Sequence, residues 1–148
     1  AGGESPDLVD AMHLVFEEAN RLLTRGELEA AERRYAKAGE FAAQAGLEAN
    51  VAAARGQIAN ILAIRGELDE ALRIRREEEL PVFERLGEVH ELLVARANLA
   101  MLLQKGDAEG RAEACVLLCL ALADAQSLGT PEGDQIEQIL AQQEMECA

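Results

Sequence analysis

The sequence predicts an all-α protein built of three helical hairpins and a final capping helix. Three observations carry this prediction: the composition, a glycine turn that recurs at a fixed interval, and apolar residues at helical spacing. Of the 148 residues 49% are hydrophobic, but only 3% are aromatic and none is Trp. Small and unbranched side chains suit closely packed helices, whereas strands favour β-branched and aromatic residues.

A four-residue turn recurs along the chain. Arg25-Gly26-Glu27-Leu28 returns as Arg65-Gly66-Glu67-Leu68, and a weaker copy stands at Lys105-Gly106-Asp107-Ala108, so that successive glycines are 40 residues apart. A second series of glycines falls between these turns, at Gly46, Gly87 and Gly129. Glycine tolerates the left-handed conformation that ends many helices, so each turn marks a boundary between two helices.

Other positions keep the same offset as the turns. Asn20 and Asn60 precede their glycines by the same distance, and Ala31 and Ala71 follow at equal distance. Ala112 is interpreted as the third alanine, one residue late because of an insertion near Gly110. This agreement predicts three structural repeats, at about residues 6–46, 47–87 and 88–129.

The apolar residues between the turns follow helical spacing. Leu8, Met12, Val15, Ala19 and Leu22 form one stripe in the first segment, as expected of an amphipathic helix. We therefore predict seven helices, at about residues 6–24, 27–45, 47–65, 67–86, 88–105, 108–128 and 131–146.

Two of these helices have special features. Pro81 lies inside the fourth and lacks a backbone N–H, so we expect a kink or break near 77–81. The last helix begins at Thr130-Pro131-Glu132, a typical helix start. It carries one narrow apolar stripe of Ile136, Ile139 and Leu140, which predicts a capping helix at 131–146 because no further repeat covers its outer face.

The charge of the chain limits its partners. There are 28 acidic and 14 basic residues, for a net charge of −14. Such a surface repels phosphate backbones and anionic lipids, which argues against nucleic acid or membrane partners. The negative charge would help a cationic partner to approach. The alternative interpretation is that it serves only to keep the domain soluble.

The three cysteines do not suggest a disulfide framework, because their number is odd. Cys115 and Cys119 are interpreted as core thiols in a buried helix rather than as ligands of a soft metal, and Cys147 lies near the terminus. No segment resembles a secretory signal, so a cytoplasmic location is expected. The chain begins Ala1-Gly2-Gly3 without Met, which suggests a fragment of a longer protein or a cloning remnant.

Nothing in the sequence predicts an enzyme, a metal site or a cofactor. His13 and His90 are the only histidines, and neither belongs to a zinc-binding helix pattern. The turn glycines stand singly, so no phosphate-binding loop exists. Glu77-Glu78-Glu79 is interpreted as a solvated helix face rather than a calcium loop, since it lacks the turn glycine and alternating ligands of such a loop.

The segments Gly26-Glu27-Leu28-Glu29-Ala30-Ala31 and Gly66-Glu67-Leu68-Asp69-Glu70-Ala71 resemble the middle of a tetratricopeptide (TPR) motif. The resemblance is greatest to longer, roughly 40-residue TPR-like repeats of bacterial multidomain proteins. It implies a right-handed superhelix of three hairpins with a concave groove lined by the first helix of each. The early bulky aromatic residue of the motif is absent, and the third copy is degenerate.

In this family the groove accepts an extended peptide or a partner helix, and an asparagine often hydrogen-bonds the peptide backbone. Aligned on the turns, the groove positions are His13, Phe16, Asn20 and Leu23, then Ala53, Gly56, Asn60 and Ala63, then Leu93, Arg96, Ala100 and Leu103. The alternative interpretation of Asn20 and Asn60 is that they bridge adjacent helices. Arg96 and Arg55 are too few for recognition of an acidic C-terminus.

The sequence and the resemblance together predict a protein–protein interaction module, or scaffold, that binds a peptide or helix of a partner. The alternative is a structural or regulatory segment of a larger multidomain signalling protein, acting by self-association or by docking within that protein.

Overall fold

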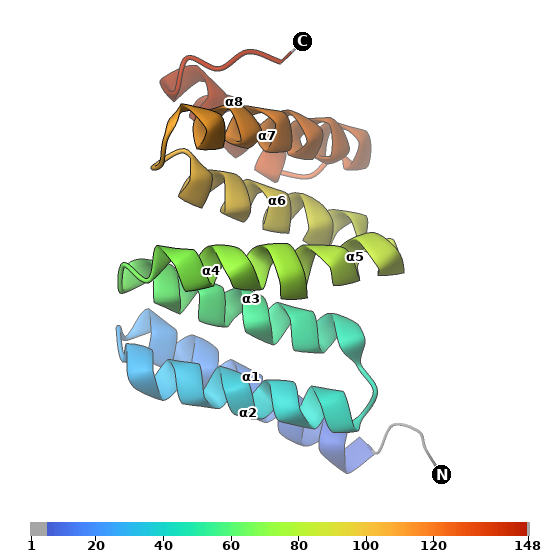
Figure 1. The fold of residues 1–148 in the computed structure, drawn as a ribbon. Helices are drawn as coiled ribbons and strands as arrows, with labels where there is room; N and C mark the ends of the chain where they lie inside the picture. The colour runs from blue at the N-terminus through green and yellow to red at the C-terminus, as the bar shows by residue number, and fades with distance from the viewer. Residues whose placement is uncertain (1–5, 148) are drawn as a thin grey trace. The chain divides into compact units, whose positions relative to one another are not determined.

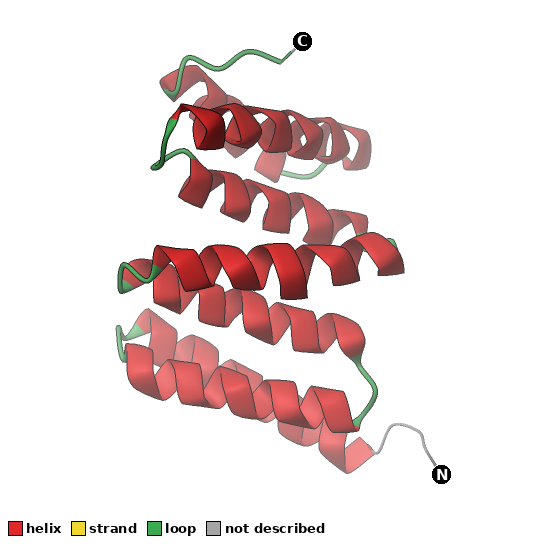
Figure 2. Cartoon of the chain, viewed as in Figure 1, coloured by secondary structure: helices red, strands yellow, loops and turns green. Residues whose placement is uncertain are grey.

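The computed structural model describes residues 6–147, which form seven helical segments and contain no strand (Figures 1 and 2). The all-α prediction is therefore confirmed for these residues. Ala1-Gly2-Gly3 lies outside the described residues. The elements are α1 (Pro6–Thr24), α2 (Leu28–Gln44), α3 (Glu48–Ile64), α4 (Leu68–Ile74), the π-helical turn η1 (Arg75–Glu79), α5 (Leu80–Leu86), α6 (Val89–Leu103), α7 (Ala108–Leu128) and α8 (Glu132–Gln142).

The chain divides into two compact units, one ending at Val82 and one beginning at Phe83, so the boundary falls inside α5. In the first unit α1 packs on α2, α2 on α3, and α3 on both α4 and η1. In the second unit α6 packs on α7, and α7 on α8. Each unit thus consists of helices packed against their neighbours in the chain, while the single domain expected over 1–148 stays a prediction.

The predicted glycine turns are present at the ends of α1 and α3. Gly26 has φ 79° and Gly66 has φ 86°, a backbone region that glycine enters at little cost. In both turns the amide of the next glutamate donates to a carbonyl five residues earlier: Glu27 to Leu22 at 3.0 Å and Glu67 to Leu62 at 2.8 Å. This bond satisfies a carbonyl that the helix end leaves free.

The third turn is built differently. The side chain of Asp107 accepts a hydrogen bond from the amide of Gly110 at 2.8 Å and so caps α7. Ala112 is exposed, whereas Ala114 is fully buried, as are Ala31 and Ala71. Ala112 therefore does not share the buried position of Ala31 and Ala71.

The helix that contains Pro81 is disturbed but not broken. The chain stays helical from Leu68 to Leu86, with a π-helical turn at Arg75–Glu79 immediately before the proline turn. A π turn inserts one residue into the helix and changes which side chains face inward beyond it. The break expected as one alternative near 77–81 is not observed, and the irregularity that the helix has there is the π turn at Arg75–Glu79.

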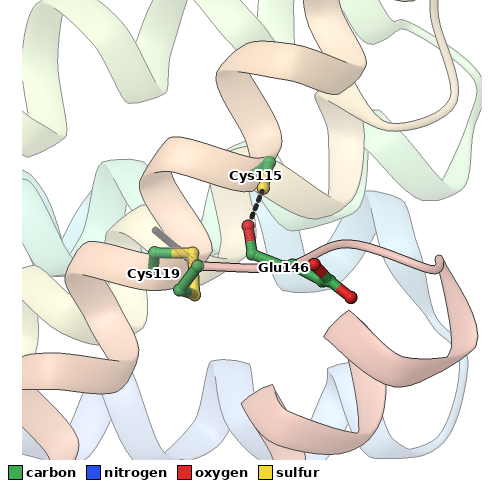
Figure 3. The surroundings of a disulfide bond; sticks show 4 residues. Cys115, Cys119 and Glu146 are labelled. Atoms are coloured by element: carbon green, nitrogen blue, oxygen red, sulfur yellow. Dashed lines mark hydrogen bonds between the residues drawn. A yellow bond between two sulfur atoms is a disulfide. The ribbon is translucent and has the colours of Figure 1, made fainter.

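The C-terminal end departs from the prediction. Helix α8 ends at Gln142, not near 146, and Glu144 has a positive φ of 54°. Beyond it Cys147 forms a disulfide with Cys119 of α7 (Figure 3). The interpretation of Cys119 as a core thiol was therefore wrong, and the disulfide holds the non-helical segment after α8 against α7.

Each unit has its own apolar core. In the first unit Met12, Ala38 and Ala42 form a buried cluster between α1 and α2. The partly buried side chains packed around it are Val15, Phe16, Phe41, Leu47 and Val51. The buried side chains of the second unit are mainly aliphatic: Leu93 and Leu99 of α6, Leu118, Ala121 and Ala125 of α7, and Ile136 and Leu140 of α8.

Candidate functional site

Helix α1 carries the first set of predicted groove residues. His13 is exposed, and Phe16 and Leu23 are half-buried. The Phe16 ring packs edge-on against the ring of Tyr35 in α2, with 5.3 Å between centroids and 74° between planes. Such an edge-to-face contact stabilises the aromatic pair. Phe16 is therefore mainly a packing residue of the α1–α2 hairpin, while His13 is open to solvent.

Asn20 lies next along the same helix. Its Oδ1 accepts a hydrogen bond from the Tyr35 hydroxyl at 2.6 Å. Burial raises the pKa of Tyr35, so the hydroxyl keeps its proton and remains a donor at neutral pH. The carbonyl side of the Asn20 amide is thus used within the hairpin, and its nitrogen remains as the group that could donate to a partner.

A shallow hollow of about 270 Å³ adjoins Asn20 and is lined by Asn20, Arg21, Thr24 and Arg25. The Thr24 hydroxyl donates to the Asn20 backbone carbonyl at 3.0 Å. Neither Arg21 nor Arg25 forms an ion pair with any residue in the described part of the chain. The hollow therefore collects side-chain N–H donors, which suits the oxygen atoms of a peptide or a carboxylate.

Asn60 of α3 has the same kind of role as Asn20. Its Oδ1 accepts from the Arg75 guanidinium in η1, and its Nδ2 donates to Gln57 Oε1 at 3.1 Å. In both cases the asparagine bonds a side chain 15 residues further along the chain. The interpretation that these asparagines bridge adjacent helices is confirmed for both side-chain oxygens.

The Arg75 guanidinium belongs to a buried charged pair. Its Nη1 donates to Glu79 Oε1 at 2.9 Å, and the two residues are only 2% and 6% exposed. Arg75 Nε has no acceptor among the residues that the structure describes. Burial raises the pKa of Glu79, although the charge and hydrogen bond of Arg75 oppose that rise. The interpretation of Glu77-Glu78-Glu79 as a solvated helix face is therefore wrong for Glu79, which is buried.

The Glu79 carboxylate lies against α3 at Gly56. A Cβ atom at position 56 would collide with Glu79 Oε2, so only glycine leaves room for this carboxylate. Gly56 is buried, while the predicted groove residues Ala53 and Ala63 on the same helix are half-buried. Gly56 thus serves the packing of Glu79 and offers no surface to a partner.

The two other glutamates of the triplet are in ion pairs. Arg73 contacts Glu77 at 3.2 Å and Glu78 at 2.8 Å, and Arg55 contacts Glu78 at 2.9 Å. Partial burial raises the pKa of Glu78, but the hydrogen bonds and charges of Arg55 and Arg73 outweigh it and hold the pKa below its usual value. The Arg55 guanidinium is thereby engaged with Glu78.

The α6 positions in the second unit are largely internal. Leu93 and Ala100 are fully buried, and Leu103 is nearly so. Arg96 is paired with Asp124 of α7, with 3.1 Å between Nη1 and Oδ2. The structure therefore places these leucines and this alanine in the core rather than on an open face, and it commits the Arg96 charge to α7.

The hollow beside Asn20 brings together four accessible residues, Asn20, Arg21, Thr24 and Arg25. Of these four residues the sequence predicted only Asn20, because the groove positions were assigned by aligning the copies on their turn glycines. The sequence signal for the other residues was a pair of basic residues four apart in an acidic chain, Arg21 in α1 and Arg25 in the turn after it.

No family model matches the chain, and neither a curated protein nor a solved structure matches it. Within residues 6–147 no three or more His, Cys, Asp or Glu side chains are grouped so as to hold a metal ion. No helix in that same range is long and apolar enough to cross a bilayer.

Proposed function

We propose that this chain is a TPR-like protein–protein interaction module that binds a peptide or helix of a partner protein. In this proposal its three hairpins stack as repeats in a right-handed superhelix, and the partner lies against the first helix of the first hairpin. Peptide contact centres on α1, with His13, Asn20, Arg21 and Arg25 as the residues that touch the partner.

The repeat assignment is supported by two features that recur 40 residues apart. The turns at Gly26 and Gly66 share the left-handed glycine and the same amide-to-carbonyl bond. Asn20 and Asn60 share an acceptor role toward the next helix. Agreement in both turn and bridge favours duplicated hairpins over a bundle of unrelated helices.

The observation that carries the binding proposal is the hollow beside Asn20. The hollow brings together two guanidinium groups, Arg21 and Arg25, that have no ion pair to described residues, in a chain with 28 acidic and 14 basic residues. Arginine is also enriched among residues that dominate binding energy at interfaces. An extended peptide places backbone carbonyls and side-chain oxygens where such donors can hold it.

The test is to select binding peptides from a random displayed library and measure their affinities for variants. Replacing Arg21 and Arg25 by Ala should weaken binding about tenfold or more, the usual loss when interface anchors are truncated. The matched control replaces Arg33 and Lys105 by Ala, which removes the same charge elsewhere. Equal affinity of the two double variants would show that the hollow does not bind the peptide.

A second candidate, self-association or docking within a larger protein, is favoured by Val116 and Leu120. These side chains are 61% and 47% exposed and lie four residues apart on α7, where i and i+4 share a face. Light scattering across a concentration series tests it: a dimer that Val116→Ser with Leu120→Ser abolishes would support this candidate, and a monomer throughout would eliminate self-association.

A further inference from the structure

All three cysteines of the chain meet in the second unit. Cys119 of α7 is joined to Cys147, with 5.6 Å between their Cα atoms, while Cys115 is free and half-buried. Figure 3 shows the Cys115 side chain directed at the backbone of Glu146, and its Sγ lies 3.6 Å from the Glu146 carbonyl oxygen. The free thiol therefore touches the residue that immediately precedes the bonded Cys147.

Cys115 and Cys119 are four residues apart on α7, hence on the same face and about 6 Å apart along the helix axis. The segment after α8, residues 143–147, is not helical. Five extended residues can span roughly 16 Å, so a shift of about one helical turn is within the reach of Cys147. Position 115 could then meet the Cα separation that a disulfide requires.

We propose that Cys115, Cys119 and Cys147 form a thiol–disulfide exchange site in which Cys147 pairs alternately with Cys119 and Cys115. The Cys115 thiolate attacks Cys147 Sγ, a new S–S bond forms between them, and the bond to Cys119 breaks. Cys119 leaves as a thiolate and takes up a proton, which balances the proton that Cys115 released. One disulfide and one thiol are present before and after, so no oxidant or reductant is consumed.

The Cys119 pairing is the more populated of the two. It preserves the hydrogen bond from the Met145 amide to the Leu140 carbonyl, 2.8 Å long, that closes α8. Moving Cys147 by one turn along α7 breaks this bond, and the loss of one such bond shifts an equilibrium by roughly fivefold. The exchange thus sets two positions of the segment 143–147 on α7, each fixed covalently.

The experiment compares wild type, Cys115→Ser and Cys119→Ser, each equilibrated in a buffer of reduced and oxidised glutathione. We expect both variants to form one intramolecular disulfide, Cys119–Cys147 in the first and Cys115–Cys147 in the second. In Cys147→Ser both remaining thiols stay reduced, because Cβ atoms four apart on a helix are too distant for a disulfide. A Cys115–Cys119 bond there would overturn the geometry on which the proposal rests.

A second measurement needs no variant. Free thiols of wild type are alkylated with one reagent, the disulfide is reduced, and the released thiols are alkylated with another. Cleavage after Glu113 and Asp124 gives one peptide with both helix cysteines, and its fragmentation between them assigns each label. We expect Cys119 to carry the first label in about one molecule in six. The proposal is overturned if Cys119 never carries it, or if Cys119→Ser folds and leaves Cys115 and Cys147 reduced.

Discussion

The two compact units are stabilised by different means. The first contains a buried ion pair, Arg75–Glu79, and two side-chain hydrogen bonds between helices, in which Asn20 and Asn60 are the acceptors. The second holds only four of the fourteen basic residues, and it combines an aliphatic core with a disulfide. Polar groups in a core must all be satisfied to avoid a desolvation penalty, whereas a disulfide acts mainly on the unfolded chain. The first unit is therefore sensitive to single polar substitutions, and the second to reduction.

The largest expected effect is in the first unit. Glu79→Ala removes the carboxylate that Arg75 Nη1 contacts, leaving a buried guanidinium with fewer acceptors and a cavity beside Gly56. Breaking a buried pair in this way should lower the free energy of unfolding by about 3–5 kcal/mol. Urea denaturation followed by circular dichroism measures it.

Two control variants sharpen this prediction. Glu77→Ala removes an exposed carboxylate from the same π turn and should change stability by less than about 0.5 kcal/mol. Glu79→Gln keeps an oxygen acceptor for Arg75, so its free energy of unfolding should lie between those of Glu77→Ala and Glu79→Ala. A Glu79→Ala variant as stable as Glu77→Ala would mean that the buried pair does not hold α3 and η1 together.

The second effect concerns the disulfide. Cys147→Ser opens a cross-link between residues 28 apart in the sequence, and the chain-entropy relation assigns such a loop about 3.6 kcal/mol. We expect faster amide hydrogen exchange in α8 and in residues 143–147, with α1–α3 unchanged. Reduction of the wild type should reproduce this result, and equal exchange in oxidised and reduced protein would contradict it.

The parts of the fold that local patterns determine were predictable from the sequence. The turns at Gly26 and Gly66, the helical stripes and the disturbance before Pro81 each depend on residues within a few positions of one another. The hydrogen bond between Asn20 and the next helix could be predicted only as one of two alternatives, because the partner of Asn20 lies in another helix. Turn spacing located that asparagine correctly but could not distinguish a hydrogen bond to Tyr35 from one to a peptide.

The features that sequence reasoning missed depend on register and on distant contacts. Glu79 lies in the π turn η1 and is buried, whereas a run of three glutamates by itself indicated a solvated face. Cys147 pairs with Cys119 only because the chain reverses after α8, which the helical pattern near 146 concealed. The binding proposed for the hollow beside Asn20 depends on Arg21 and Arg25 having no ion pair. Whether they have one depends on where the carboxylates lie in the folded chain.

A smaller effect distinguishes the two asparagines. Asn60→Ala deprives the buried Arg75 guanidinium of an acceptor, so we expect a loss of about 1–3 kcal/mol. Asn20 is exposed and bonds a neutral hydroxyl, so Asn20→Ala should cost at most about 1 kcal/mol. Denaturant titration of the two single variants measures the difference. Equal losses would indicate that Arg75 finds another acceptor when Asn60 is absent.

The smallest effect is a pH dependence that differs in sign between neighbouring glutamates. The pKa of Glu78 is lowered in the folded protein, because Arg55 and Arg73 outweigh its partial burial. A lowered folded pKa means that Glu78 adds stability above its unfolded pKa, near 4.3, and loses it as pH falls through the folded pKa. Since a third of this side chain is exposed, Glu78→Gln should lose no more than about 1 kcal/mol at pH 7, and nothing at low pH.

For Glu79 the sign is reversed, because burial raises its folded pKa. The folded state then binds a proton more tightly than the unfolded state, so the contribution of Glu79 is fully present below about pH 4.3 and declines as pH rises through the folded pKa. Relative to wild type, Glu79→Gln should therefore gain stability as pH rises from 4 to 7, whereas Glu78→Gln should lose it. Denaturation of the three proteins across this range measures both slopes. Parallel slopes would mean that the π turn does not separate the two carboxylates into a solvated and a buried environment.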